Sequence, residues 1–191
     1  PYWRSELPGE TYRLLQGVFP RTWVLDPRPL PPHAVIPGLS VGGQSVTAWS
    51  QLKAATQKER ELVIKPSGYS PLAWGSRGVA VGHDLPAQEW EAALENALAA
   101  FPKTPHILQE FHTAERLDVR YYDFFSQTVR TMPGRARLCP YYFVTGEEEI
   151  RLGGILATVS SLEKKVIHGM VDAVMAPVAI EDGRSGKGGA A

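Results

Sequence analysis

The chain has 191 residues, 20 basic and 20 acidic side chains, and a single cysteine. This length allows one domain, or one domain with an appendage. The zero net charge does not suggest a broad nucleic-acid or acidic-membrane footprint, although local basic clusters can still matter. Because Cys139 stands alone, it excludes an internal disulfide framework and a cysteine-rich zinc site, and we expect a reduced, cytoplasmic setting.

No apolar run approaches the roughly 18 residues that a membrane span requires, and no signal-peptide pattern is present. The sequence therefore predicts neither membrane nor nucleic acid as a partner, and it leaves the oligomeric state open. Because the chain begins at Pro1 instead of a methionine, we expect a fragment of something longer.

The first 44 residues hold proline at a density that favours extended or turn backbone over regular helix. We expect an extended arm rich in proline and aromatic residues there, with a short strand over 21–25. Residues 45–59 predict a helix, because Ala48, Leu52 and Ala55 fall on one stripe.

Residues 62–82, LVIKPSGYSPLAWGSRGVAVG, predict two strands joined by a loop of Gly, Ser and Pro. The first strand ends in Lys65. A loop of this kind can close its N–H groups over anionic oxygens while the lysine supplies charge, which indicates a phosphate cradle. An ordinary hairpin loop with a solubilising surface lysine is the alternative.

The sequence HDLPAQEWEAALENALAAF predicts an amphipathic helix with Asp84 as its N-cap and Trp90 and Leu94 on its core face. A strand is predicted next, over 106–111. Further strands are predicted over 118–125, 127–132, 135–144, 150–159 and 170–180, with turns at 132–135 and 145–147. The Gly-rich end predicts disorder, and its GRSGKGG lacks the spacing of a P-loop.

In their order, LVIKP, WGSRGVAVG, the helix and ILQEF resemble the nucleotide-binding fold of the ATP-grasp superfamily, over residues 62 to about 178. Some features are similar to its glutathionylspermidine-synthase-like branch. The resemblance implies an α+β fold in which two α+β lobes with antiparallel sheets clasp a nucleotide. The chain then comprises an arm (1–44), an ATP-grasp-like domain (45–180, with lobes of about 45–111 and 112–180) and a disordered tail (181–191).

The resemblance also implies roles for the lysine and the loop. Lys65 would hold the ATP phosphates, and the loop would fold over them through Ser67, Gly75, Ser76 and Gly78. Arg77 would reach the γ-phosphate as a catalytic residue. A solvated loop arginine is the alternative for Arg77.

The strand that joins the two lobes would bind the nucleoside. Gln109 and Phe111 would offer backbone groups to adenine, and the Glu110 carboxylate would accept from the ribose hydroxyls. Strand alternation places Glu110 on the face opposite to the other two, so a solvent-facing glutamate is the alternative.

Arg135 and Arg137 alternate onto one face of a strand, where two arginines require an anion or carboxylates. A triphosphate or acyl-phosphate is one interpretation, with Arg137 as the stronger catalytic candidate, and Arg120 would play a similar role. Structural ion pairs are the alternative. The family holds Mg²⁺ through late carboxylates, and here Asp172 and Glu181 are the candidates, although the family's Glu-x-Asn is missing.

These features predict an ATP-dependent carboxylate–amine or carboxylate–thiol ligase that acts through an acyl-phosphate with ATP and Mg²⁺. A non-catalytic nucleotide-binding module of a larger protein is one alternative, and an α+β interaction domain without a nucleotide is another. The sequence does not identify the carboxylate substrate or the acceptor.

Overall fold

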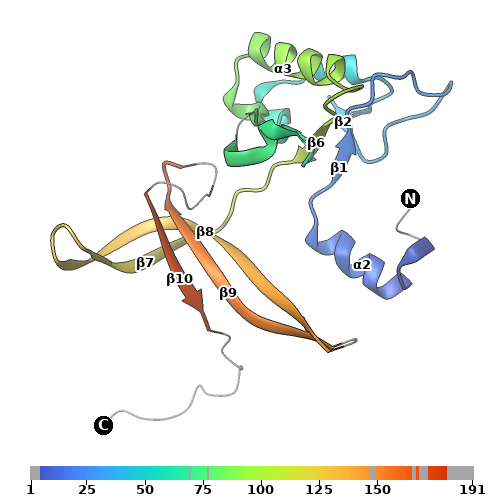
Figure 1. The fold of residues 1–191 in the computed structure, drawn as a ribbon. Coiled ribbons are helices and arrows are strands. Elements are labelled where there is room, and N and C mark those ends of the chain that lie inside the picture. The colour runs from blue at the N-terminus through green and yellow to red at the C-terminus, as the bar shows by residue number, and fades with distance from the viewer. Residues whose placement is uncertain are drawn as a thin grey trace. The chain divides into compact units, whose positions relative to one another are not determined.

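The computed structural model describes residues 5–68, 70–76, 78–146, 149–164, 167 and 172–179, with residues 74–76 described by their backbone alone. Over these residues the protein is a mixed α+β structure with antiparallel sheets and few helices (Figure 1). It divides into two compact units, unit 1 over Pro1–His112 and unit 2 over Thr113–Ala191. None of the helices described is long and apolar enough to cross a membrane.

The elements described in unit 1 are, in chain order, α2 (Gly9–Val18), β1 (Thr22–Val24), β2 (Ser40–Val41), β3 (Gln44–Ser45), the 3-10 helices η1 (Trp49–Ala54) and η2 (Gln57–Glu59), β4 (Leu62–Pro66), η3 (Pro71–Ser76), β5 (Ala80–Val81), η4 (Gly82–Asp84), α3 (Ala87–Ala99) and β6 (His106–Glu110). Those of unit 2 are β7 (Arg116–Asp123), β8 (Thr128–Thr145), β9 (Glu149–Ser161) and β10 (Ala173–Val178).

The helix α2 contradicts the expectation of an extended arm without regular helix. Its sequence, GETYRLLQGV, contains no proline, and Pro8 precedes the first turn, where a missing N–H costs nothing. None of its residues is buried. The high proline count of residues 1–44 therefore describes the flanks of this helix and not its interior.

The sheet of unit 1 has the strand order β1-β6-β4-β5, and every pairing is antiparallel. The predicted strands at 21–25, 62–66 and 106–111 are confirmed. The predicted hairpin is confirmed as well, because Val63 pairs with Val81 and Ile64 with Ala80. β6 is a central strand, since it pairs with β1 on one side and with β4 on the other.

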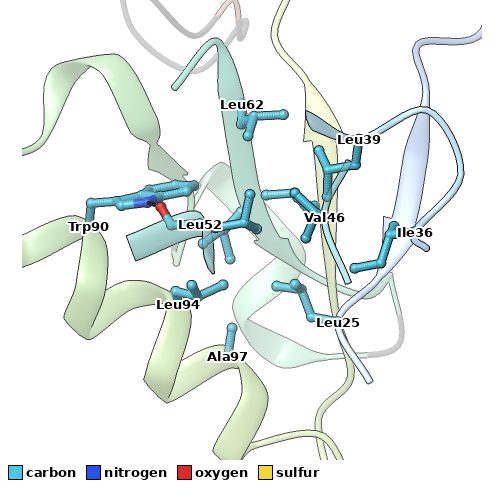
Figure 2. Packing of buried hydrophobic residues seen from close by; sticks show 11 residues of the cluster. Leu25, Ile36, Leu39, Val46, Leu52, Leu62, Trp90, Leu94 and Ala97 are labelled. Atoms are coloured by element: carbon cyan, nitrogen blue, oxygen red, sulfur yellow. Dashed lines mark hydrogen bonds between the residues drawn. The ribbon is translucent and has the colours of Figure 1, made fainter. Parts of the chain in front are cut away.

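The core of unit 1 lies between this sheet and α3. Figure 2 shows Trp90, Leu94 and Ala97 projecting from α3 toward Leu52 and Val46. Trp90 is fully buried, and its indole N–H donates to the Leu52 carbonyl at 2.9 Å. The predicted apolar stripe of the helix is therefore confirmed, although Pro86 and not Asp84 is the N-cap.

Residues 45–59 do not form the continuous helix that their apolar spacing predicted. β3 takes up Ser45, and the short 3-10 helices η1 and η2 form over parts of the remaining segment. The side chain of Gln51 accepts the N–H groups of Thr47 (2.6 Å) and Ala48 (3.0 Å). Leu52 still points into the core, so the predicted buried position is right while the α-helical period is wrong.

In unit 2 the strands form an antiparallel sheet in the order β10-β9-β8-β7, so each strand pairs with its neighbour in sequence (Figure 1). The turn predicted at 132–135 is wrong, because β8 runs without interruption from Thr128 to Thr145. Pro133 lies just before the pairing with β9 begins at Gly134, where one side of β8 is open and a missing donor is tolerated. Gly134 approaches β9 so closely that an added Cβ would lie 2.6 Å from the Ser160 carbonyl oxygen.

The described part of unit 2 contains strands and turns but no helix, so the helices that an α+β second lobe requires are not among the residues described. Gly146 has a φ of 78° and marks the second predicted turn, which is confirmed at that residue. The predicted disordered tail at 181–191 lies outside the described residues.

Candidate functional site

Lys65 lies on the face of the unit 1 sheet that is opposite to the core. The register pairs Lys65 with Ile107 and Val63 with Gln109, so these four side chains share one face. Leu62 and its alternate neighbours project from the other face into the core. The lysine predicted to hold phosphates is thus anchored on a strand whose other face is fixed by α3.

A short chain of hydrogen bonds extends from Lys65 across three strands. Lys65 Nζ donates to Gln109 Oε1 at 2.7 Å, and Gln109 Nε2 donates to Thr22 Oγ1 at 2.7 Å. The Thr22 hydroxyl donates to the Pro20 carbonyl at 3.0 Å. Two of the predicted site residues, Lys65 and Gln109, are therefore in direct contact, and Thr22 fixes the orientation of the amide between them.

Burial and a neutral hydrogen-bond partner determine the charge environment of Lys65. The side chain is half-buried, and burial lowers its pKa because the charged ammonium loses water. Its hydrogen-bond partner is a neutral amide, and it has no ion pair among the described residues. A desolvated cation that faces only a neutral acceptor gains from an incoming anion.

The described part of the predicted phosphate loop contains a 3-10 helix with its own hydrogen bonds, where the sequence predicted a flexible Gly/Ser loop. Residues of the loop form η3, and the N–H groups of Ser70 and Ala73 donate to the carbonyls of Ser67 and Ser70. The Ser67 N–H donates to Pro105 at 2.8 Å. These three donors are already engaged and are not turned toward a ligand.

The two ends of this loop meet beside Lys65. Gly78 has a φ of 73°, a left-handed conformation that favours glycine, and an added Cβ would contact the Pro66 ring at 3.5 Å. Gly75 and Ser76 belong to η3, where the backbone alone is described. Arg77 lies outside the described residues.

The residues predicted to bind adenine and ribose are separated by the strand pleat. Gln109 faces Lys65, whereas Glu110 lies on the opposite face and has the Arg21 guanidinium at 3.6 Å and the His112 imidazole at 3.7 Å. The N–H of Phe111 donates to the Glu61 carbonyl at 2.9 Å, and the N–H of Glu110 donates to the Arg21 carbonyl at 3.0 Å. Of the backbone donors predicted for adenine, the Phe111 N–H therefore already has a protein partner, and Glu110 has basic neighbours within the protein.

The predicted arginines lie in unit 2 and share one face of its sheet. Alternation along β7 and β8 places Arg120, Arg135 and Arg137 on that face. Arg116 joins them, because it pairs directly with Arg135 across the two strands. We call this surface the arginine face; it comprises Arg116, Arg120, Arg135 and Arg137.

Sequence reasoning missed Arg116 and Thr22 for the same reason. Each takes its place through a cross-strand pairing, with Arg135 in one case and Gln109 in the other. A turn placed at 124–127 would have paired Arg116 with Arg135, but the Pro and Gly at 133–134 favour a turn there instead. Nothing local in the sequence pairs Thr22 with a residue 87 positions away.

The residues described do not fit a Mg²⁺ site. Asp172 is 80% exposed, and the Lys164 ammonium lies 3.5 Å from its carboxylate. Over the described parts of the chain there is no group of three or more side chains able to hold a metal ion. Glu181 lies outside the described residues. Asp172 is therefore the one predicted metal ligand whose surroundings the structure describes, and these do not fit Mg²⁺.

Comparison of the chain with protein-family models, with curated proteins and with solved structures gave no match. A function for this chain therefore has to be inferred from the geometry around Lys65 and on the arginine face.

Proposed function

We propose that the chain binds ATP, with the phosphates held on the Lys65 face of unit 1. One observation carries this proposal: Lys65 is a half-buried cation, held by the neutral Gln109 amide and without an ion pair in the described residues. Burial of a charge is costly unless an opposite charge compensates it. A phosphate at this position would supply that charge.

The position of the loop beside Lys65 is consistent with a phosphate ligand there. The loop over 67–78 begins two residues after Lys65 and returns to Pro66 at Gly78. A ligand at Lys65 would therefore lie at the base of this loop. The order β4, loop, β5, α3 and β6 is also the order of elements that the ATP-grasp resemblance requires.

The reaction that we propose is ATP-dependent ligation of a carboxylate to an amine or thiol. A carboxylate oxygen of the substrate would attack the γ-phosphorus, and ADP would leave with the electron pair of the broken P–O bond. The amine or thiol would then attack the acyl carbon, and inorganic phosphate would leave. In this scheme Lys65 offsets phosphate charge and positions the donor.

A nucleotide-binding module without turnover is the second candidate. It is favoured by the position of Asp172, which lies exposed beside Lys164. A carboxylate with a cationic neighbour is a weaker ligand for Mg²⁺, because the two cations repel each other.

The proposal can be tested by thermal-shift titration with ATP and ADP, with and without Mg²⁺. Wild-type protein and the control Lys103→Gln, which alters an exposed lysine, should both be stabilised by nucleotide. Lys65→Gln should lose this stabilisation, which amounts to about 2.7 kcal/mol at a ligand concentration of 100 Kd. Equal stabilisation of all three proteins, or none in the wild type, would contradict the proposal.

Phosphate release then separates the two candidates. Ligation predicts ATP-dependent release of phosphate with a mixture of amino acids or polyamines, and none with Lys65→Gln. A binding module predicts a nucleotide shift that ignores Mg²⁺ and no release with any acceptor.

A further inference from the structure

The arginine face carries a row of four positive charges, none of which has an ion pair among the described residues. Among the described residues, Arg116, Arg120 and Arg137 have neither a hydrogen bond nor an ion pair, and all three are exposed. Arg135 is half-buried and donates from Nη1 to the Leu162 carbonyl at 3.1 Å, while its Nε is buried without a partner.

Other arginines of unit 2 do have carboxylate partners. On the opposite face, Arg130 Nη1 donates to Asp123 at 3.0 Å. Near the end of the β8–β9 hairpin, Arg151 Nε donates to Glu149 at 2.8 Å. Over β7 and β8, Asp118 is the one carboxylate on the arginine face, because Asp123 lies on the other face and β8 contains none. On β7 and β8, four guanidinium groups therefore share this face with one carboxylate.

The length of the row indicates the kind of anion that fits it. Arg137 is two residues along β8 from Arg135, and Arg120 pairs with Thr131, four residues in the other direction. At about 3.4 Å per residue, the row spans roughly 20 Å. One small anion cannot contact all of it, whereas a polyanion with regularly spaced charges can.

Two exposed tyrosines flank the row on the same face. Tyr122 follows Arg120 by two positions in β7 and is 49% exposed. Tyr141 follows Arg137 by four positions in β8 and is 52% exposed. Exposed aromatic rings beside a basic track provide stacking surfaces for unpaired bases, and a duplex does not offer its bases in this way.

We propose that the arginine face binds single-stranded nucleic acid, with the arginines on successive phosphates and Tyr122 and Tyr141 against bases. Binding is independent of base sequence, because phosphates carry no sequence information and every base has a stacking face. The neutral charge of the whole chain does not oppose this, since four arginines are gathered on one face of one sheet. The inference does not depend on the proposed ATP site, which lies in unit 1.

The test is fluorescence anisotropy of the full chain with labelled oligo(dT), oligo(U) and a matched duplex. We expect the single strands to bind more tightly than the duplex, with an affinity that falls as salt rises. With four phosphate contacts, the slope of log K against log salt should be near −3, at about −0.7 per contact.

The decisive variant is Arg116→Gln with Arg137→Gln, because both side chains are exposed and unpaired. We expect at least a tenfold loss of affinity and a salt slope smaller by about 1.4, since two contacts are lost. The matched control, Arg13→Gln with Arg130→Gln, removes the same charge from α2 and from the opposite face, and it should bind like the wild type. Tyr122→Leu with Tyr141→Leu should weaken binding by about tenfold or more while leaving the salt slope unchanged.

Equal losses in the arginine pair and its control would overturn the inference. So would tighter binding of duplex than of single strands, or binding to phosphatidylserine vesicles without binding to oligonucleotide. Lys65→Gln separates this site from the proposed ATP site. It should leave oligonucleotide binding unchanged, and loss of that binding would show that the site is not on unit 2.

Discussion

The two units bury their residues in different ways. Unit 1 packs one face of its sheet against α3 and η1, and a continuous cluster of apolar side chains fills the space between them. In unit 2 the buried side chains described are consecutive ones at 157–160 of β9, and they include the polar Thr158 and Ser160. Unit 1 is therefore expected to depend on apolar packing, and unit 2 on strand pairing and close backbone approach at the centre of its sheet.

The same contrast applies to charge. Unit 1 holds its candidate cation half-buried, with one hydrogen-bond partner fixed by neighbouring strands. Unit 2 leaves its arginines in a row at the surface of a sheet. A single buried cation is suited to one small ligand, and an extended row is suited to a long one.

The largest effect is expected from Trp90→Ala, which removes the biggest fully buried side chain of unit 1. Large-to-small changes of this kind cost about 3–5 kcal/mol because they leave a cavity. Urea unfolding followed by tryptophan fluorescence reports unit 1, because all five tryptophans lie in residues 1–112. Leu14→Ala, at a position that is 67% exposed, is the control and should change the stability little.

Hydrogen exchange of the same variant sharpens the comparison. Amides of β4 and β6 should lose protection, whereas those of β8 and β9 should keep it if each unit is stabilised by its own contacts. An equal loss in both units would contradict this separation.

A second test addresses the centre of the unit 2 sheet. Gly134→Ala places a methyl group 2.6 Å from the Ser160 carbonyl oxygen, so β8 and β9 must move apart. Overpacking of this kind costs typically about 1–3 kcal/mol. Gly154→Ala is the matched control on β9, because an added Cβ there meets nothing within 4 Å. Equal effects of the two substitutions on hydrogen exchange in unit 2 would show that the close approach is unimportant.

A smaller effect is expected from Lys65 on the pH dependence of the free energy of unfolding. Burial lowers its pKa in the folded state below the ordinary 10.5, so near that pH the unfolded chain holds more protons than the folded one. The free energy of unfolding should therefore gain a contribution that rises with pH toward 10.5. Lys65→Gln should lose this contribution and Lys103→Gln should keep it. If the free energy of unfolding rose equally with pH in both variants, the lowered pKa could not be assigned to Lys65.

The smallest effect on stability is expected from a substitution at the β7–β8 turn. Asp123 accepts hydrogen bonds from the Ser126 hydroxyl (2.8 Å) and the Phe125 N–H (3.0 Å), and these lower its pKa below 3.8. Its contribution to stability is present above pH 3.8 and is lost as the pH falls through the lowered value. Asp123→Asn should have a slightly lower melting temperature at neutral pH, and the difference should disappear in acid. A difference that persists in acid would assign the effect to something other than the charge.

The strands and the packed helix could be predicted from the sequence because their patterns are local. The helical period of α3 and the β-branched residues of β4 each mark an element directly. Lys65 is marked by the same means, since it ends an apolar strand. Its partner Gln109 is predicted for its backbone groups, whereas the structure uses its side chain.

What could not be predicted depended on pairing between distant residues or on the placement of prolines. Pro133 and Gly134 have the composition of a turn, yet they lie within β8 because one edge is open at Pro133 and the backbones approach closely at Gly134. The prolines around α2 concealed a segment of ten residues that contains none. For α2, composition was averaged over a window that holds both the helix and its proline-rich flanks, whereas for Pro133 and Gly134 strand pairing outweighed the local turn composition.

The central position of β6 has a consequence for the order of events during folding. β1 and β4 both pair with β6, so neither the Thr22–Gln109 nor the Lys65–Gln109 contact can form before residue 109 leaves the ribosome. The sheet of unit 1 therefore cannot be completed until nearly all of this unit has been synthesised. The large sequence separation of its strand pairs is expected to make folding slow. Unit 2 joins each strand to the next and can assemble one hairpin at a time as it is synthesised. The nascent chain thus carries β4 without its β6 partner until the last strand of unit 1 has emerged.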